Sequence, residues 1–296
     1  MITHAEHPVF LEFDRYAGGA VPGCLLNFLG QRTNPAFVSL SDAHGPSLLF
    51  GQDLAETSTA DYPPISEESF EWIAVLDSVL EAHKTLTMFE LGAGFGRWMV
   101  TAVCAARRKR RDLVLKLVGV EPEPTHFGFM HQHFLDNGLN SKEHNLIEAA
   151  VNANGKPVSF VVGHPREWYG ESIVEQGFFA QDYPAARIIR VPAVTLNNLL
   201  KPHRYVDLVD ADIQGAELEV VTSSIDAMTK KVRRAYISTH SADIHSKVAQ
   251  AFRTAGWTLR EIHGWSGEKH EETQFGPISF GDGIQYWLNS HVAPRR

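Results

Sequence analysis

The stretch that decides the fold reads Thr87-Met88-Phe89-Glu90-Leu91-Gly92-Ala93-Gly94-Phe95-Gly96-Arg97-Trp98. An apolar run leads into glycines at three alternate positions, and a helical pattern begins at Arg97. This order predicts a strand, a tight glycine turn and a helix N-terminus, which together form the entrance to a nucleotide-type pocket. A dinucleotide-binding motif needs a third glycine where the chain has Arg97, so the turn departs from that motif.

Glu90 adds a second constraint on the ligand. A carboxylate beside the turn would repel a pyrophosphate and would suit a cation. S-adenosylmethionine (SAM) fits, because it carries a sulfonium and an ammonium and has no phosphate. The alternative is a plain strand, turn and helix whose glycines serve only the backbone.

Composition and charge bound the class of protein. The 296 residues allow one large domain or one domain with an extension. Hydrophobic content of 44% and charged content of 21% are ordinary for a soluble globular protein. A net charge of −8 argues against a nucleic-acid partner. The basic run 107–111 is expected to be a solvated helix end.

Cysteines and apolar runs limit the location. Cys24 and Cys104 match no zinc spacing and predict no disulfide framework. The N-terminus lacks a signal pattern, and no apolar run is long enough to span a bilayer. A reducing cytoplasm is the default expectation, and homo-oligomer formation is left open.

The chain divides by composition near residue 65. Glycines and prolines punctuate short apolar runs over residues 1–65, which predicts an N-terminal extension with short strands. Over residues 66–296, strand-like runs alternate with helical patterns, which indicates a mostly parallel α/β sheet. We expect strands at residues 85–89, 112–121, 144–151, 157–162, 187–191, 205–210, 232–239, 257–262 and 284–288. We expect helices at residues 66–80, 96–110, 124–137, 195–200, 215–223 and 242–255.

Three connections carry specific expectations. Ser66 is predicted to cap the first of these helices. Asn154-Gly155 predicts a hairpin-like turn. Residues 263–277 are predicted to form a polar loop. Residues 163–184 are rich in aromatic side chains, so they are expected to form a lid or substrate wall or else to pack against the core.

Glu121 ends the second strand of the α/β region, 25 residues after Gly96. A carboxylate at that place and spacing accepts both hydroxyl groups of a cofactor ribose. Glu123 is a weaker rival for the role. A solvent-exposed glutamate is the alternative.

Two aspartates follow the strand at 205–210, in the run Asp210-Ala211-Asp212-Ile213-Gln214-Gly215-Ala216-Glu217. Ligands of open parallel sheets lie beyond the carboxyl ends of strands, so one aspartate is expected to face the cofactor and the other the acceptor. Glu217 can join them from the next helix. The alternative is structural, with Asp212 capping that helix.

His240 ends the next strand and points toward the same crevice by the same rule. Histidine is a natural general base near neutral pH, and methylation of a hydroxyl requires removal of its proton. A metal site that uses Asp212, Asp243 and His245 ranks below a plain base, because no firm ligand spacing is present. We therefore predict no metal.

Together these motifs resemble the SAM-dependent methyltransferases of the FkbM type, from about Phe70 to Leu288. The resemblance rests on residues 90–96, 118–122, 149–155, 195–200 and, most specifically, 206–220. It implies a class I, Rossmann-like fold with a seven-stranded, mostly parallel sheet whose last strand is reversed. Family members usually have lysine where this chain has Asp210 and glutamate where it has Gln214, which leaves the acceptor open.

The resemblance implies a SAM-dependent O-methyltransferase that acts on a hydroxyl of a sugar, glycan or natural product and releases S-adenosylhomocysteine (SAH). We expect cofactor contacts from Glu90, Gly92, Gly94, Gly96, Glu121, Ala149, Ala150, Asn152 and Asp210. His240 is expected to take the acceptor proton, with Asp212 as partner or substitute and Glu217 beside them. The alternatives are an NAD(P)-dependent oxidoreductase and a non-catalytic module that binds SAM or a sugar.

Overall fold

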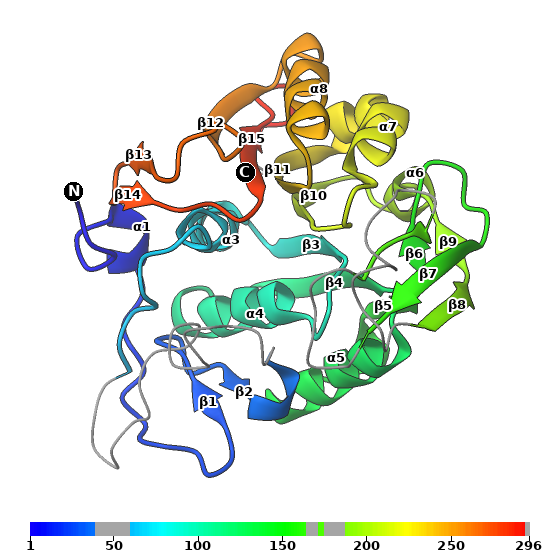
Figure 1. The fold of residues 1–296 in the computed structure, drawn as a ribbon. Helices are drawn as coiled ribbons and strands as arrows, with labels where there is room; N and C mark the ends of the chain where they lie inside the picture. Colours follow the sequence, from blue (N-terminus) through cyan, green and yellow to red (C-terminus); the bar gives the residue numbers. More distant parts are fainter. Residues whose placement is uncertain (39–59, 164–170, 175–186, 294–296) are drawn as a thin grey trace.

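The structure, a computed structural model, describes residues 1–38, 60–163, 171–174 and 187–293. Within these residues the centre is a seven-stranded sheet of order β12-β15-β11-β10-β3-β4-β5 (Figure 1). Its strands are β3 (Thr85–Leu91), β4 (Val114–Glu121), β5 (Asn145–Glu148), β10 (Val206–Ala211), β11 (Val232–Thr239), β12 (Thr258–His263) and β15 (Gly283–Leu288). Strand β15 is antiparallel to β11 and β12, whereas the other pairs are parallel. The predicted sheet with a reversed last strand is confirmed.

Helices cover both faces of the sheet. They are α3 (Ser69–Glu81), α4 (Arg97–Lys109), α5 (Pro124–Asp136), α6 (Leu196–Leu200), α7 (Glu217–Lys231) and α8 (Ala242–Thr254). Figure 1 shows α4 and α5 on one side of the sheet and α7 and α8 on the other. Successive side chains of β3 point to opposite faces of the sheet. Met88 belongs to the apolar cluster that contains α3, α4 and α5, and Phe89 to the cluster that contains α6, α7 and α8.

The described part of the predicted N-terminal extension joins the core. It contains α1 (Pro8–Leu11), β1 (Leu25–Leu26), β2 (Arg32–Thr33) and the 3₁₀ helix η1 (Pro35–Phe37). Phe10 and Phe28 are fully buried in the same apolar cluster as α3 and α4. The Gln31 side chain donates to the Arg97 carbonyl oxygen (3.1 Å). The boundary at residue 65 stays a prediction.

Two expected helices differ in extent. Helix α3 begins at Ser69, not after Ser66, because Ser66 forms a turn whose carbonyl oxygen accepts from the Ser69 amide. Helix α7 runs from Glu217 to Lys231, well past residue 223, because its buried face continues through Met228.

Two connections also differ. Gly155 has a φ of 69°, so the predicted turn is present, but it does not join a hairpin. Strand β6 (Ala150–Val151) pairs with β9 (Ala193–Val194), and β7 (Val158–Val162) pairs with β8 (Arg187–Val191). The expected polar loop at 263–277 contains the hairpin of β13 (Glu271–Thr273) and β14 (Gly276–Ile278), which buries Phe275 and Ile278 in the core. Among the described helices, none has the length and apolarity needed to cross a membrane.

Candidate active site

The glycine turn brings the ends of β3 and β10 into contact. Gly92, Gly94 and Gly96 have φ values of 74°, 53° and 70°, a region that glycine enters without steric cost. A Cβ atom on Gly92 would lie 1.7 Å from the Asp212 carbonyl oxygen. The Asp212 amide also donates to the Leu91 carbonyl oxygen (2.9 Å). The cofactor-type turn and the predicted catalytic loop therefore form one unit.

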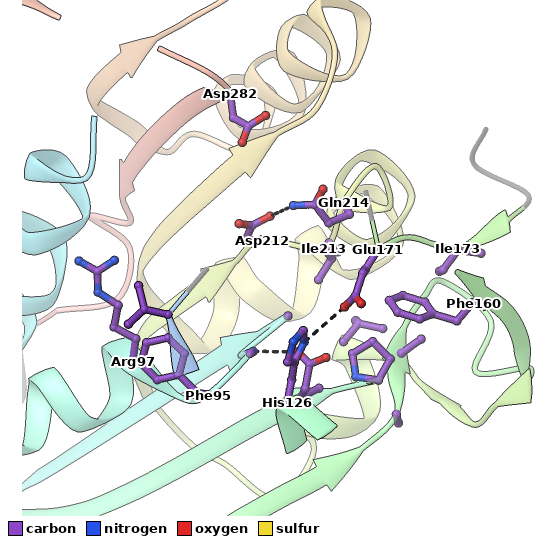
Figure 2. Close-up of a pocket in the computed structure, with 18 of the residues that line it drawn as sticks. Phe95, Arg97, His126, Phe160, Glu171, Ile173, Asp212, Ile213, Gln214 and Asp282 are labelled. Atoms are coloured by element: carbon purple, nitrogen blue, oxygen red, sulfur yellow. Dashed lines mark hydrogen bonds and ion pairs between the residues drawn. The ribbon is translucent and has the colours of Figure 1, made fainter. Parts of the chain in front are cut away.

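A cavity of about 260 Å³ opens beyond the carboxyl ends of the strands (Figure 2). One half, here called the cofactor half, is lined by Gly92, Gly94, Glu121, Pro122, His126, Ala149, Ala150, Val151, Phe160, Glu171 and Ile173. The other, the acceptor half, is lined by Glu68, Arg97, Asp212, Ile213, Gln214 and Asp282. This is the location that open parallel sheets give to their ligands.

Glu121 lines the cofactor half and holds the backbone around it. Its Oε2 accepts from the Gly94 amide (2.7 Å) and its Oε1 from the Glu123 amide (2.8 Å). Burial raises the pKa of Glu121 to about 7. Glu123, the rival for the ribose role, instead caps α5 by accepting from the His126 amide (2.7 Å), and it does not line the cavity.

The predicted adenine contacts divide in two. Ala149 and Ala150 line the cofactor half. Asn152 does not, because its side chain holds the following turn: Oδ1 accepts from the Gly155 amide (2.7 Å), and Nδ2 donates to the Lys156 carbonyl oxygen (3.0 Å).

Glu90, Asp210 and Gly96 lie outside the cavity lining. Glu90 caps α4, since its carboxylate accepts from the amides of Trp98 (3.2 Å) and Met99 (2.8 Å). Asp210 lies beside Glu90 in the register of β10 and β3. Burial raises the pKa of Asp210 to about 7 and that of Glu90 well above its usual range. The cofactor contacts predicted for these residues stay predictions.

His240 lies among carboxylates. The structure brings the three predicted catalytic residues, His240, Asp212 and Glu217, together around its ring. Its Nδ1 is 2.9 Å from Glu217 Oε1, and its Nε2 is 3.3 Å from Asp212 Oδ1 and 3.8 Å from Asp282 Oδ2. Burial lowers the pKa of His240, but hydrogen bonds to Asp212 and Glu217 and the charges of these residues raise it to about 11. The imidazole is thus protonated near neutral pH.

Asp212 is the member of this group that faces the cavity. Its side chain is 46% exposed, whereas the side chains of His240 and Glu217 are 5% and 0% exposed. Gln214 Nε2 donates to Asp212 Oδ1 (2.8 Å). Partial burial opposes ionisation of Asp212, yet its hydrogen bonds with His240 and Gln214 and the His240 charge lower its pKa.

Several lining residues were not predicted from the sequence. Asp282 precedes β15, and because this strand is reversed, its first residues lie at the carboxyl edge of the sheet. The expected reversal could therefore have placed Asp282 near the cavity. Arg97 donates to both Glu68 carboxylate oxygens (2.5 and 2.7 Å). His126 and Glu171 meet across the cofactor half, and no local pattern marks that pairing.

The aromatic segment and the metal alternative have separate outcomes. The aromatic residues at positions 168, 169, 178, 179 and 183 lie outside the described residues.

No group of His, Cys, Asp and Glu in the described ranges is arranged to hold a metal ion. His245 Nδ1 lies 2.8 Å from the Thr239 hydroxyl, and Asp243 pairs with Lys247 (2.6 Å).

Comparisons with known proteins agree with this architecture. Residues 90–270 match the family described as "Methyltransferase FkbM domain". A protein of Jannaschia sp. (strain CCS1) named "Putative methyltransferase" is 29% identical over 254 residues, which cover 84% of this chain and 87% of that protein.

Solved structures resemble the chain more distantly. The methyltransferase FkbM from Methylobacillus flagellatus KT is 12% identical with a TM-score of 0.40, and the match covers 69% of this chain and 44% of that chain. A precorrin-6y C5,15-methyltransferase from Geobacter metallireducens GS-15 is 14% identical with a TM-score of 0.39, and the match covers 73% of this chain and 86% of that chain.

Proposed function

The chain belongs to the FkbM methyltransferase family, and from this premise we propose that it transfers a methyl group from SAM to a hydroxyl of a sugar, glycan or natural product, releasing SAH. The observation that carries the proposal is one cavity bounded by a buried ribose-type carboxylate, Glu121, and by Asp212 of the Asp212–His240–Glu217 group. The two ends of this cavity match the needs of a cofactor and of an acceptor that must lose a proton.

The residues of the cofactor half fit SAM. Each Glu121 oxygen accepts one backbone amide and keeps acceptor capacity for a ribose hydroxyl. The Gly92 and Gly94 backbone, free of side chains, allows close approach of the methionine portion. Ala150, Phe160 and Ile173 provide an apolar wall for an adenine ring. When bound, SAM supplies a methyl group on a cationic sulfur.

The acceptor half supplies the proton acceptor. Because His240 stays protonated near pH 7, we assign proton acceptance to the exposed Asp212 carboxylate and not to the ring. Glu217 Oε1 accepts a hydrogen bond from Nδ1 of the His240 ring, which directs Nε2 of the ring toward Asp212. The imidazolium then stabilises the Asp212 carboxylate in position. Alignment of acceptor oxygen and methyl group in this half can contribute about 7–11 kcal/mol to lowering the barrier.

Isothermal titration with SAM tests the cofactor assignment. We expect binding by the wild-type protein and a 10- to 100-fold weaker affinity for Glu121→Gln, since a hydrogen bond to a charged group is worth about 1.5–3 kcal/mol. Glu148→Gln is the matched control, because Glu148 is exposed and lies beside Glu121 in the register of β4 and β5. Its affinity should equal that of the wild type.

Absence of SAM binding, or stabilisation by NAD and not by SAM, would reject the cofactor. Release of SAH with a panel of sugar and natural-product alcohols tests the acceptor class. Tight SAM binding without turnover on any alcohol would argue against O-methyl transfer.

A further inference from the structure

Trp265 lies in the loop between β12 and β13 and has no role in the function proposed above (Figure 1). Its indole Nε1 donates to the carbonyl oxygen of Thr239 (3.1 Å), the last residue of β11 and the neighbour of His240. A Cβ atom on Gly283, the first residue of β15, would overlap the Cδ1 and Nε1 atoms of Trp265. The pyrrole edge of the ring therefore packs against the ends of β11 and β15.

The two strand ends that hold the ring also bound the acceptor half of the cavity. Asp282 immediately precedes Gly283 and lines that half, and its Oδ2 lies 3.8 Å from His240 Nε2. A Cβ atom on Gly264 would lie 2.6 Å from the Asp282 carbonyl oxygen, so the loop itself packs against this residue. Trp265 is not part of the cavity lining. It therefore lies at the rim of the acceptor half.

Trp265 is also exposed where comparable side chains are buried. It is 43% exposed, whereas the other tryptophans in the described part of the chain, Trp72, Trp98, Trp257 and Trp287, are 0–7% exposed. An indole ring combines a large apolar surface with one polar N–H group. In Trp265 the N–H group is satisfied by the backbone, and a large part of the residue remains in contact with solvent.

Backbone strain marks the same place. Among the residues that the structure describes, the non-glycine residues with positive φ are Gln214 (49°) and Trp265 (61°). Gln214 lines the acceptor half, and its side chain donates to Asp212. Gly264 and Gly267 also have positive φ, so a bulky ring stands in the same loop at a position whose conformation favours glycine. Strain of this kind clusters at ligand-binding sites, and both strained residues lie at the acceptor half.

We propose that Trp265 binds the acceptor and that the acceptor is a pyranoside, with the exposed indole surface packed against the C–H face of a sugar ring whose hydroxyl reaches Asp212. A pyranose ring has C–H groups on its faces, which the negative face of an aromatic ring attracts. Its rim carries hydroxyl groups, which the carboxylates of Asp212 and Asp282 can accept. This inference rests on the proposed function and narrows its acceptor class.

The probe is a panel of acceptors, given to the full chain with SAM. It contains methyl pyranosides of hexoses, 6-deoxyhexoses and hexuronic acids, and it contains acyclic polyols and phenols for comparison. Release of SAH gives kcat and KM for each acceptor. We expect the wild type to methylate a pyranoside in preference to the polyols and phenols.

Two replacements of the ring separate its aromatic face from its apolar bulk. Trp265→Leu keeps apolar bulk without an aromatic face, and it should raise KM for the pyranoside about 10- to 100-fold while kcat stays within about threefold. Trp265→Phe keeps an aromatic face, and it should raise KM by no more than about fivefold. If the ring only held the strand ends in place, its loss would displace His240 and Asp282 and lower kcat for every acceptor.

A second variant and a matched control complete the series. Trp265→Gly serves if leucine is not tolerated, because a φ of 61° favours glycine, and it should raise KM as Trp265→Leu does. Glu268→Ala is the control, since Glu268 is an exposed residue of the same loop, and its KM should equal that of the wild type. Calorimetric SAM affinity should be the same in all variants, because the loop does not line the cofactor half.

The outcomes separate the inference from the proposed function. If the wild type methylates polyols or phenols and no pyranoside, the inference is overturned and the proposed function stands. The same holds if Trp265→Leu and Trp265→Gly keep the wild-type KM for the pyranoside, or if they lower kcat equally for all acceptors. If the wild type binds SAM but methylates no alcohol, O-methyl transfer fails and the inference fails with it.

Discussion

The two halves of the cavity hold their carboxylates by different means. In the cofactor half, Glu121 accepts from the backbone amides of Gly94 and Glu123, and its pKa is about 7. In the acceptor half, Asp212 lies 3.3 Å from His240 Nε2, and its pKa is lowered. Glu121, the last residue of β4, and Asp212, the first residue after β10, thus acquire opposite pKa shifts in one cavity.

The difference shows what offsets burial. The charge of His126 and the amides of Glu123 and Gly94 offset the desolvation of Glu121 only in part. Hydrogen bonds from His240 and Gln214 and the His240 charge offset the desolvation of Asp212 fully. The cofactor half can therefore change its charge near neutral pH, and the acceptor half keeps its ionised carboxylate. Gly92 of the cofactor half lies against the backbone of Asp212 in the acceptor half.

The largest effect is expected in the acceptor half. Asp212→Asn and His240→Gln should each lower the rate of methyl transfer about 10³-fold, within the 10²–10⁴ range of proton-transfer catalysis, and leave SAM affinity within about twofold. Rates of SAH formation and calorimetric SAM binding measure the two quantities. Asp243→Asn, which alters an exposed ion pair with Lys247, is the control and should keep the wild-type rate.

Full activity of either variant would contradict the assignment of proton transfer to this group. A parallel loss of SAM affinity would show that the two halves are not separable.

The next effect tests the contact between the halves. Gly92→Ala should destabilise the protein by about 3 kcal/mol, because its Cβ would overlap the Asp212 carbonyl oxygen at a φ of 74°. Urea denaturation measures the free energy of unfolding. Gly128→Ala is the control: nothing lies within 4 Å of a Cβ there, and alanine favours the α5 helix by up to about 1 kcal/mol. Equal stability of the two variants would break the inferred contact.

The smallest effect concerns Asp210, a buried acid whose side chain shares a hydrogen bond with the side chain of another acid, Glu71. Burial raises the pKa of Asp210 from 3.8 to about 7, so its contribution to stability is complete below pH 3.8 and is lost as pH rises through 7. Asp210→Asn should therefore be more stable than the wild type by at least about 1 kcal/mol at pH 8, because each unit of pKa shift corresponds to about 1.4 kcal/mol. The advantage should disappear near pH 4.

Thermal unfolding across this pH range measures the difference. The same sense of pH dependence applies to His240 at higher pH, because its pKa is also raised: its contribution is complete below pH 6.5 and is lost as pH rises through 11. A stability difference between Asp210→Asn and the wild type that does not change with pH would contradict this prediction. It would show that Asp210 stays protonated over the whole range, or that a neighbouring group is protonated when Asp210 ionises.

Much of this arrangement was predictable from the sequence. The periodicity around residues 85–97 predicted β3, the glycine turn and α4. Placing Glu121, Asp212 and His240 at strand ends was enough to bring them to one edge, because parallel strands end on the same side of a sheet. Alternation along β3 also explains Glu90, which shares the face of Met88 and so points to α4.

Other features depended on segments far apart in the chain. The hairpin of β13 and β14 forms in a polar stretch because Phe275 and Ile278 are buried in the apolar cluster that contains α3. Asp282 approaches His240, and Glu171 approaches His126, only once the sheet is assembled. Local patterning carries no signal for such distances.

The sequence by itself determined the order of strand, glycine turn and helix at residues 85–110. It also determined that Glu121 and Asp212 lie at strand ends, because hydrophobic periodicity and glycine spacing are local properties. Only the tertiary structure decided that Asp212 lies against an imidazolium and that Glu121 accepts from backbone amides. The reason is physical: a pKa depends on burial and on charges within a few ångströms, and the chain brings those neighbours together only on folding.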